Sequence, residues 1–99
     1  MAEWKMTVDV SLIWDVYRDQ DVYDEAVFSS YRDAVVSKMR NTHWYAQSAD
    51  LQDLLEELEE SDDIDSFNMV WSSIYDLADY DRVWINTIGG RANVWTSIS

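Results

Sequence analysis

The sequence predicts an α+β fold in which three helices pack on a small antiparallel sheet, in the order strand–helix–helix–helix–strand–strand. Three observations lead to this prediction: alternating polarity near the N-terminus, apolar residues at helical spacing in the middle, and two apolar runs around Gly89 and Gly90. The chain has 99 residues, of which 47% are hydrophobic and 14% aromatic. We therefore expect one acidic domain, residues 1–99, with a compact core.

The first predicted element is a strand over Trp4–Leu12. Its odd positions are polar and its even positions apolar, which is the period of a strand with one buried face. The apolar positions are Trp4, Met6, Val8, Val10 and Leu12. Residues 13–21 fit either a strand end or a helical turn, and we assign them to a connection.

The middle of the chain predicts three amphipathic helices. The first runs from about Tyr23 to Met39, and the polar residues 41–48 end it. In the second, Leu51–Glu60, the leucines follow the i, i+3, i+4, i+7 spacing of one helix face, and Ser48 is suited to cap it. The third follows a break at residues 61–63 and runs to about Asp79. Its predicted core residues are Phe67, Val70, Trp71, Ile74 and Ala78.

The C-terminal part predicts a β-hairpin. Two strand-like runs, Arg82–Ile88 and Arg91–Ile98, flank Gly89-Gly90, which supplies the positive φ of a two-residue turn. This register pairs Trp84 with Trp95 and Ile85 with Val94. The hairpin and the N-terminal strand would form the three-stranded antiparallel sheet.

The composition restricts the class of partner. Twenty acidic and seven basic residues give a net charge of −13, so the phosphates of DNA, RNA or anionic lipid would be repelled. A basic protein is the better partner. The chain has no Cys, no apolar run near the roughly 20 residues that span a bilayer, and no secretory signal pattern. We expect it to work in the cytoplasm of a host cell, without a membrane.

The carboxylates are concentrated in one segment. Nine of them lie between Asp50 and Asp65, with no basic residue among them. Like charges stand four residues apart at Asp53 and Glu57, and at Glu56 and Glu60, which costs a helix stability. The residues predicted to contact a partner are Asp50, Asp53, Glu56, Glu57, Glu59, Glu60, Asp62, Asp63 and Asp65, continued by Asp76, Asp79 and Asp81. A second patch is offered by Asp15, Asp19, Asp21, Asp24 and Glu25.

Other kinds of site receive little support from the sequence. The one histidine, His43, has no Cys, Gly-x-Ser-x-Gly motif or phosphate-binding loop to work with, so we predict no enzyme, no catalytic residue and no cofactor. Asp62, Asp63 and Asp65 resemble the start of a calcium loop. However, Phe67 stands where the next ligand belongs and no Gly follows, so we predict a charged linker and no metal site.

Three explanations of the acidic segment remain: a solvated face, salt adaptation, or imitation of a polyanion. Salt adaptation would scatter the acids, whereas here Arg32, Lys38 and Arg40 gather on the first helix and residues 50–65 hold no base. Carboxylates four residues apart on a helix are separated by about 6 Å of rise, comparable to the phosphate spacing of a nucleic-acid strand. The like-charge spacing therefore favours imitation of nucleic acid, or another surface for a basic protein.

In size, charge, absence of Cys and its acidic helix over Leu51–Glu60, the chain resembles the small DNA-mimic proteins of phages and mobile elements, the anti-restriction and anti-CRISPR class. The resemblance rests on these general properties and on no shared motif, so it transfers no residue roles and no topology. It implies a non-enzymatic inhibitor that occupies the DNA- or RNA-binding site of a host defence protein, either a CRISPR effector or a restriction enzyme.

Two rival functions stay open. An immunity protein or antitoxin would also be small and acidic, and would neutralise one basic nuclease. A structural or assembly protein would instead use exposed aromatic residues, although we expect most of the six Trp to be in the core. The sequence leaves open the identity of the target and whether the chain forms a homodimer.

Overall fold

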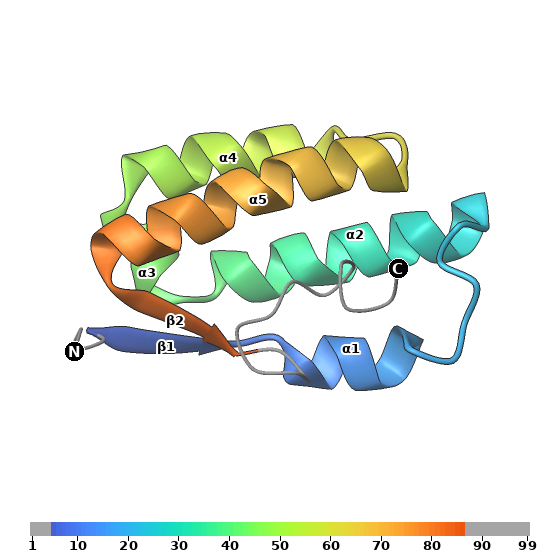
Figure 1. The fold of residues 1–99 in the computed structure, drawn as a ribbon, viewed down its shortest axis with the longest axis horizontal. Helices are drawn as coiled ribbons and strands as arrows, with labels where there is room; N and C mark the ends of the chain where they lie inside the picture. The colour runs from blue at the N-terminus through green and yellow to red at the C-terminus, as the bar shows by residue number, and fades with distance from the viewer. Residues whose placement is uncertain (1–4, 87–99) are drawn as a thin grey trace.

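Five helices and a two-stranded sheet make up residues 5–86, which are the residues that this computed structural model describes. Their order is β1 (Met6–Asp9), α1 (Ser11–Tyr17), α2 (Glu25–Arg40), α3 (His43–Gln47), α4 (Ala49–Glu59), α5 (Ile64–Asp81) and β2 (Val83–Asn86). The predicted α+β class is confirmed in its coarse form, but this part of the chain is mostly helical (Figure 1).

The sheet differs from the prediction. β1 and β2 are parallel, with Met6 opposite Val83 and Asp9 opposite Asn86, so the predicted all-antiparallel arrangement is wrong. Alternating polarity indicates which face of a strand is buried, but it does not indicate the direction of the neighbouring strand. Here the helical connection between β1 and β2 sets that direction. Of the predicted hairpin, the first strand is present as β2. The Gly89-Gly90 turn, the strand Arg91–Ile98 and the pairings of Trp95 and Val94 lie outside the described residues.

The N-terminal strand ends earlier than predicted, at a local turn that Asp9 forms with Ser11 just before α1. The carboxylate of Asp9 accepts hydrogen bonds from the backbone N–H and the hydroxyl of Ser11, at 2.9 and 2.6 Å. Such a local bond favours leaving the extended conformation. Leu12 therefore lies on α1 and is 65% exposed, not in a buried strand face. Most of the predicted connection at 13–21 is also helix, and it buries Ile13 and Trp14.

The three predicted helices are confirmed as α2, α4 and α5. The hydroxyl of Ser48 accepts the backbone N–H of Leu51 at 3.1 Å, so this residue caps α4 as expected. Of the residues predicted to be buried on α5, only Val70 is partly exposed. The short helix α3 falls where we expected a polar helix end. Thr42 caps it, and it buries Trp44.

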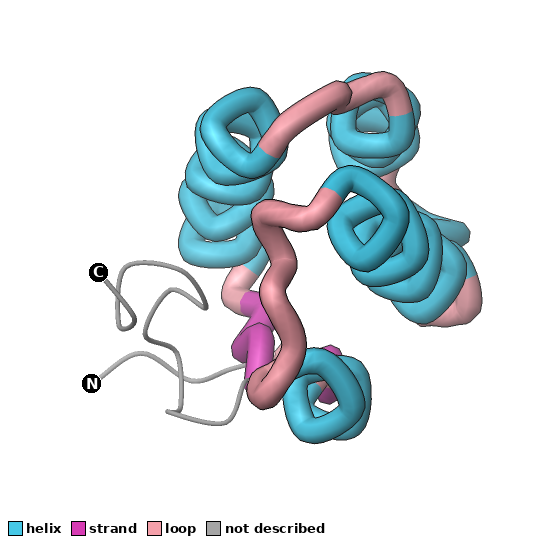
Figure 2. Tube along the Cα trace, turned by 90° about the vertical axis from the view of Figure 1, so that its right-hand side faces the viewer, coloured by secondary structure: helices cyan, strands magenta, loops and turns pink. Residues whose placement is uncertain are grey.

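The core lies between an upper pair of helices and the elements below them. α4 and α5 run side by side, α2 packs beneath them, and α1 and the sheet form the opposite side (Figures 1 and 2). Phe67 of α5 is central: its ring centroid lies 5.9 Å from those of Phe28 and Trp71, and 5.7 Å from that of Tyr31. The inner faces of α4 and α5 are thereby fixed, and their outer faces are left to solvent.

The central role of Phe67 can be tested against a neighbour on the same helix. Phe67 has no exposed surface, whereas Met69 is 74% exposed. We expect Phe67→Ala to lower the free energy of unfolding by about 3–5 kcal/mol, and Met69→Ala to change it by less than about 0.5 kcal/mol. Urea denaturation followed by circular dichroism measures both. Equal losses in the two variants would contradict this packing.

Candidate functional site

The predicted partner-binding carboxylates lie along two adjacent helices and the turn between them. All of them are exposed except Asp81, which is partly buried. Asp53, Glu56, Glu57 and Glu60 occupy the outer side of α4, opposite the leucines that it buries. Because α4 and α5 lie side by side along the upper side of the molecule in Figure 1, the acids of both helices belong to that side.

Most of these carboxylates form no ion pair with a basic residue of the described part of the chain. No Lys or Arg in residues 5–86 forms an ion pair with eight of them. These eight are Asp50, Asp53, Glu56, Glu57, Glu60, Asp62, Asp65 and Asp76. Seven of them we call the acidic face: Asp50, Asp53, Glu56, Glu57 and Glu60 at α4, with Asp65 and Asp76 of α5. The eighth, Asp62, lies in the turn between the helices, and Asp79 is exposed near the end of α5.

Glu59 does not belong to this unpaired set. Both of its oxygens accept hydrogen bonds from the guanidinium of Arg40 on α2, at 3.0 and 3.1 Å. These bonds lower the pKa of Glu59 and raise the pKa of Arg40. A carboxyl whose pKa is lower in the folded state stabilises the fold above its ordinary pKa, and this contribution is lost as the pH falls through the folded value. Glu59 thus ties α4 to α2.

Asp63 also has a structural role. Its carboxylate caps α5 by accepting the backbone N–H of Ser66 at 2.8 Å, and this bond lowers the pKa of Asp63. As for Glu59, the lowered pKa means that this contribution to stability is present at neutral pH and is lost as the pH falls through the folded value. We therefore assign Asp63 to the start of the helix.

The ends of α4 and α5 carry acids where helices favour bases. The carbonyl end of a helix is the negative end of its dipole, so cations stabilise it and anions do not. The last turns of both helices contain acidic side chains and no basic one. By contrast, α2 ends with Lys38 and Arg40. The acids in the last turns of α4 and α5 are thus unfavourable in their position, whereas Asp50 and Asp65 stand in first turns, where an acid is favourable.

The second predicted patch is not equivalent. Asp15 and Asp19 lie on either side of Arg18, at 3.7 and 3.9 Å. Asp21 and Asp24 accept backbone N–H groups near the start of α2. Its carboxylates are mostly engaged in local contacts, so this region is not a second unpaired surface.

His43 and the carboxylates of residues 62–65, which the sequence offers for other kinds of site, are exposed. His43 is exposed in the first turn of α3, as expected for a residue near a helix end. Within residues 5–86, no three His, Cys, Asp or Glu side chains are arranged to hold a metal ion. None of the described helices is long and apolar enough to cross a membrane.

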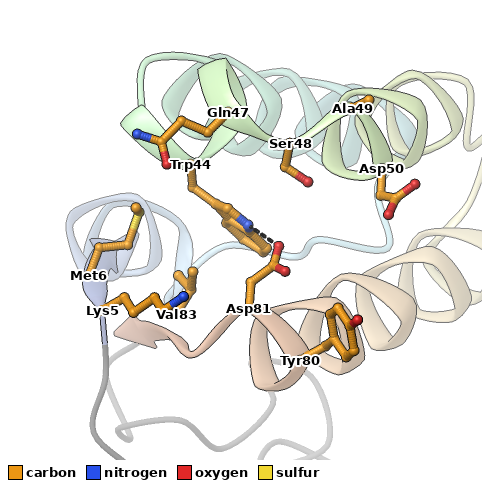
Figure 3. Close-up of a pocket in the computed structure, with 10 residues that line it drawn as sticks. All are labelled: Lys5, Met6, Trp44, Gln47, Ser48, Ala49, Asp50, Tyr80, Asp81 and Val83. Carbon is orange, nitrogen blue, oxygen red and sulfur yellow. Dashed lines mark hydrogen bonds between the residues drawn. The ribbon is translucent and has the colours of Figure 1, made fainter.

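A pocket at one end of the acidic face was missed by the sequence analysis. Its volume is about 540 Å³, and α3, α4, the end of α5 and the two strands line it (Figure 3). The indole N–H of Trp44 donates a hydrogen bond of 2.8 Å to the carboxylate of Asp81. Asp50 and Asp81 were selected for their charge alone. Nothing in the pattern indicated that Trp44 and Tyr80 would join them.

Comparison with known proteins adds no relative: the chain matches no family model, and neither a curated protein nor a solved structure is significantly similar to it.

The unfavourable charge of the acidic face can be measured. A neutral variant (Asp53→Asn, Glu56→Gln, Glu57→Gln and Glu60→Gln) removes two like-charged pairs at i, i+4. We expect its free energy of unfolding to rise by about 0.2–0.5 kcal/mol per pair, more at low than at high salt. Urea denaturation at two salt concentrations gives both values.

Glu59→Gln is the control for this measurement, because it also removes one negative charge from α4 but loses the bonds to Arg40. We expect no stabilisation from it. If Glu59→Gln stabilised the protein as much per charge as the neutral variant, net charge alone would explain the gain and the spacing on α4 would not.

Proposed function

We propose that this protein is a non-enzymatic inhibitor that imitates nucleic acid and occupies the DNA- or RNA-binding site of a host defence protein, a CRISPR effector or a restriction enzyme. The acidic face is the proposed contact surface. Its carboxylates act as phosphate surrogates for the basic residues of the target.

The observation that carries this proposal is the absence of basic partners along the acidic face within residues 5–86. Folded proteins usually intersperse opposite charges on a helix surface, because pairs at i, i+4 stabilise it. Here the same helix uses Glu59 for a two-bond ion pair with Arg40, yet leaves Asp53, Glu56 and Glu57 unpaired. A requirement other than stability accounts for this difference.

The arrangement suits a nucleic-acid-binding cleft. Along α4 the carboxylates recur every turn, at about 5–6 Å. Two further carboxylates, Asp65 and Asp76, lie on α5, which packs beside α4 with the roughly 8–10 Å between helix axes that is typical of packed helices. A surface of this kind presents negative charge in more than one row, as a duplex does. A target that binds nucleic acid through Lys and Arg would recognise it mainly by charge, and salt would weaken the complex.

A capture experiment with two variants tests this function. The immobilised protein is exposed to a bacterial lysate and then eluted with duplex DNA at constant ionic strength, and in parallel with rising salt. We expect a nucleic-acid-binding protein to be released by both. The neutral variant should lose at least about tenfold in affinity for that protein, since several charge-assisted contacts are removed.

The matched control keeps the net charge equal to that of the neutral variant. Asp15→Asn, Asp19→Asn, Glu25→Gln and Asp33→Asn also remove four exposed charges, but from α1, the turn that follows it and α2. This control should bind the target like the original protein. If both variants lost binding equally, overall acidity would be responsible and the acidic face would not be the mimic.

One observation favours the rival functions, an assembly protein that uses exposed aromatic residues or an immunity protein. Met69 is 74% exposed and Tyr80 is 85% exposed, both on the outer side of α5 beside the acids. Large exposed side chains next to charges are typical of protein interfaces. Competition with DNA for the target distinguishes a mimic from an immunity protein. DNA displaces a mimic from its target, whereas an immunity protein bound beside a nuclease active site is not displaced.

A further inference from the structure

The pocket at the end of the acidic face offers a more specific kind of recognition than charge alone. It lies where the first turn of α4 faces the last turn of α5 (Figure 3). We propose that this pocket receives an arginine side chain of the basic partner, with its guanidinium between the carboxylates of Asp50 and Asp81. The inference rests on the proposed function only in requiring a basic partner, and it names the group that the partner contributes.

Asp81 is held in position before any partner binds. Trp44 is only 2% exposed, so its ring is fixed in the core, and its N–H holds the carboxylate of Asp81 at 2.8 Å. That bond leaves the second oxygen of Asp81 available to accept from a guanidinium. Asp50 approaches from the opposite wall, on the exposed first turn of α4 (Figure 3). Two carboxylates from different helices therefore line the same pocket.

An aromatic ring stands at the same opening. Tyr80 lines the pocket and is 85% exposed, so its ring has faces that no other side chain covers. A guanidinium is flat, stacks on aromatic rings and donates hydrogen bonds in a fixed fork, whereas an ammonium is a compact point charge. A ring next to carboxylates therefore suits arginine better than lysine. The volume of about 540 Å³ is within the range of small-ligand sites and holds the whole side chain.

The charge balance of the pocket also favours a cation. The ends of α4 and α5 that meet there have opposite partial charges, so the two dipoles largely cancel and the side chains decide. The lining contains two carboxylates and one base, Lys5. Lys5 is exposed and forms no ion pair with another described residue, and the two acids leave the lining with a net negative charge. The ammonium of Lys5 does, however, repel a second cation in the pocket. Removing it should therefore strengthen the binding of a cation, whereas removing an acid should weaken it.

The probe is L-argininamide, with citrullinamide as its uncharged analogue of the same shape. Binding is followed by the indole N–H signal of Trp44 in ¹H–¹⁵N NMR spectra, assigned with Trp44→Phe. We expect a saturable shift of this signal with argininamide and none with citrullinamide. No saturable shift with argininamide, or equal shifts with both probes, would overturn the proposal.

Paired variants then locate the site. Asp50→Asn with Asp81→Asn should weaken argininamide binding at least about tenfold, since two charge-assisted contacts are lost. An Asn at position 81 keeps an oxygen that can accept the indole N–H, so the fold is preserved. Asp53→Asn with Asp76→Asn removes the same charge from the acidic face and should change binding less than about twofold. Similar losses in both pairs would overturn the proposal.

Lys5→Met provides the opposite change. Removing this exposed ammonium should tighten argininamide binding by roughly two- to fivefold, because one like charge leaves the pocket. Weaker or unchanged binding would contradict the proposed occupant. Lys5→Met and Asp50→Asn both alter exposed residues, so they test the proposal even if a change at position 81 prevents folding.

The outcome is independent of the test of nucleic-acid mimicry. If argininamide binds as expected but DNA does not displace the captured target, the pocket stands and mimicry fails. If the neutral variant loses its target but argininamide never binds, mimicry stands and the pocket inference fails.

Discussion

Burial of the inner faces of α4 and α5 around Phe67 is the contact on which the rest of the structure depends. Leu51, Leu55 and Leu58 of α4 have no exposed surface, and neither does Phe67. Each fully buried side chain of this size contributes roughly 1.5–3 kcal/mol. Repulsion between neighbouring carboxylates costs only a few tenths of a kcal/mol per pair. The helices can therefore carry an unfavourable outer surface because their inner surface holds them in place.

The sequence predicted the long helices well because their signals are redundant. α4 shows four leucines in register, opposite acids and a capping serine, and all three agree. α1 and α3 are only seven and five residues long, too short to display a helical period. The direction of the sheet was missed for a different reason. The alternation of buried and exposed residues along a strand is the same in parallel and antiparallel pairs. The direction of β2 relative to β1 is set by the helical connection between them.

The candidate site was predictable to the extent that it depends on exposure. A run of acids opposite a leucine stripe must face solvent, and it does. Two assignments needed tertiary neighbours that no local pattern provides. Glu59 meets Arg40 on another helix, and Asp81 accepts from Trp44 of α3. The charge of the surface could thus be predicted from the sequence. Which of its acids pair with a base or accept a hydrogen bond from another element could not.

The pairing of β1 with β2 has a consequence for how the chain folds. Residue 6 is opposite residue 83, with all five helices between them. Contacts so distant in sequence form late, because the chain between them must first be ordered. The described helices bring the two strands together, so we expect the sheet to form after them. Val8 of β1 and Val83 and Ile85 of β2 are buried in the same core as the inner faces of α4 and α5. Opening the sheet would therefore expose part of the core that holds the acidic helices in place, so the charged surface depends on a pairing between two distant parts of the chain.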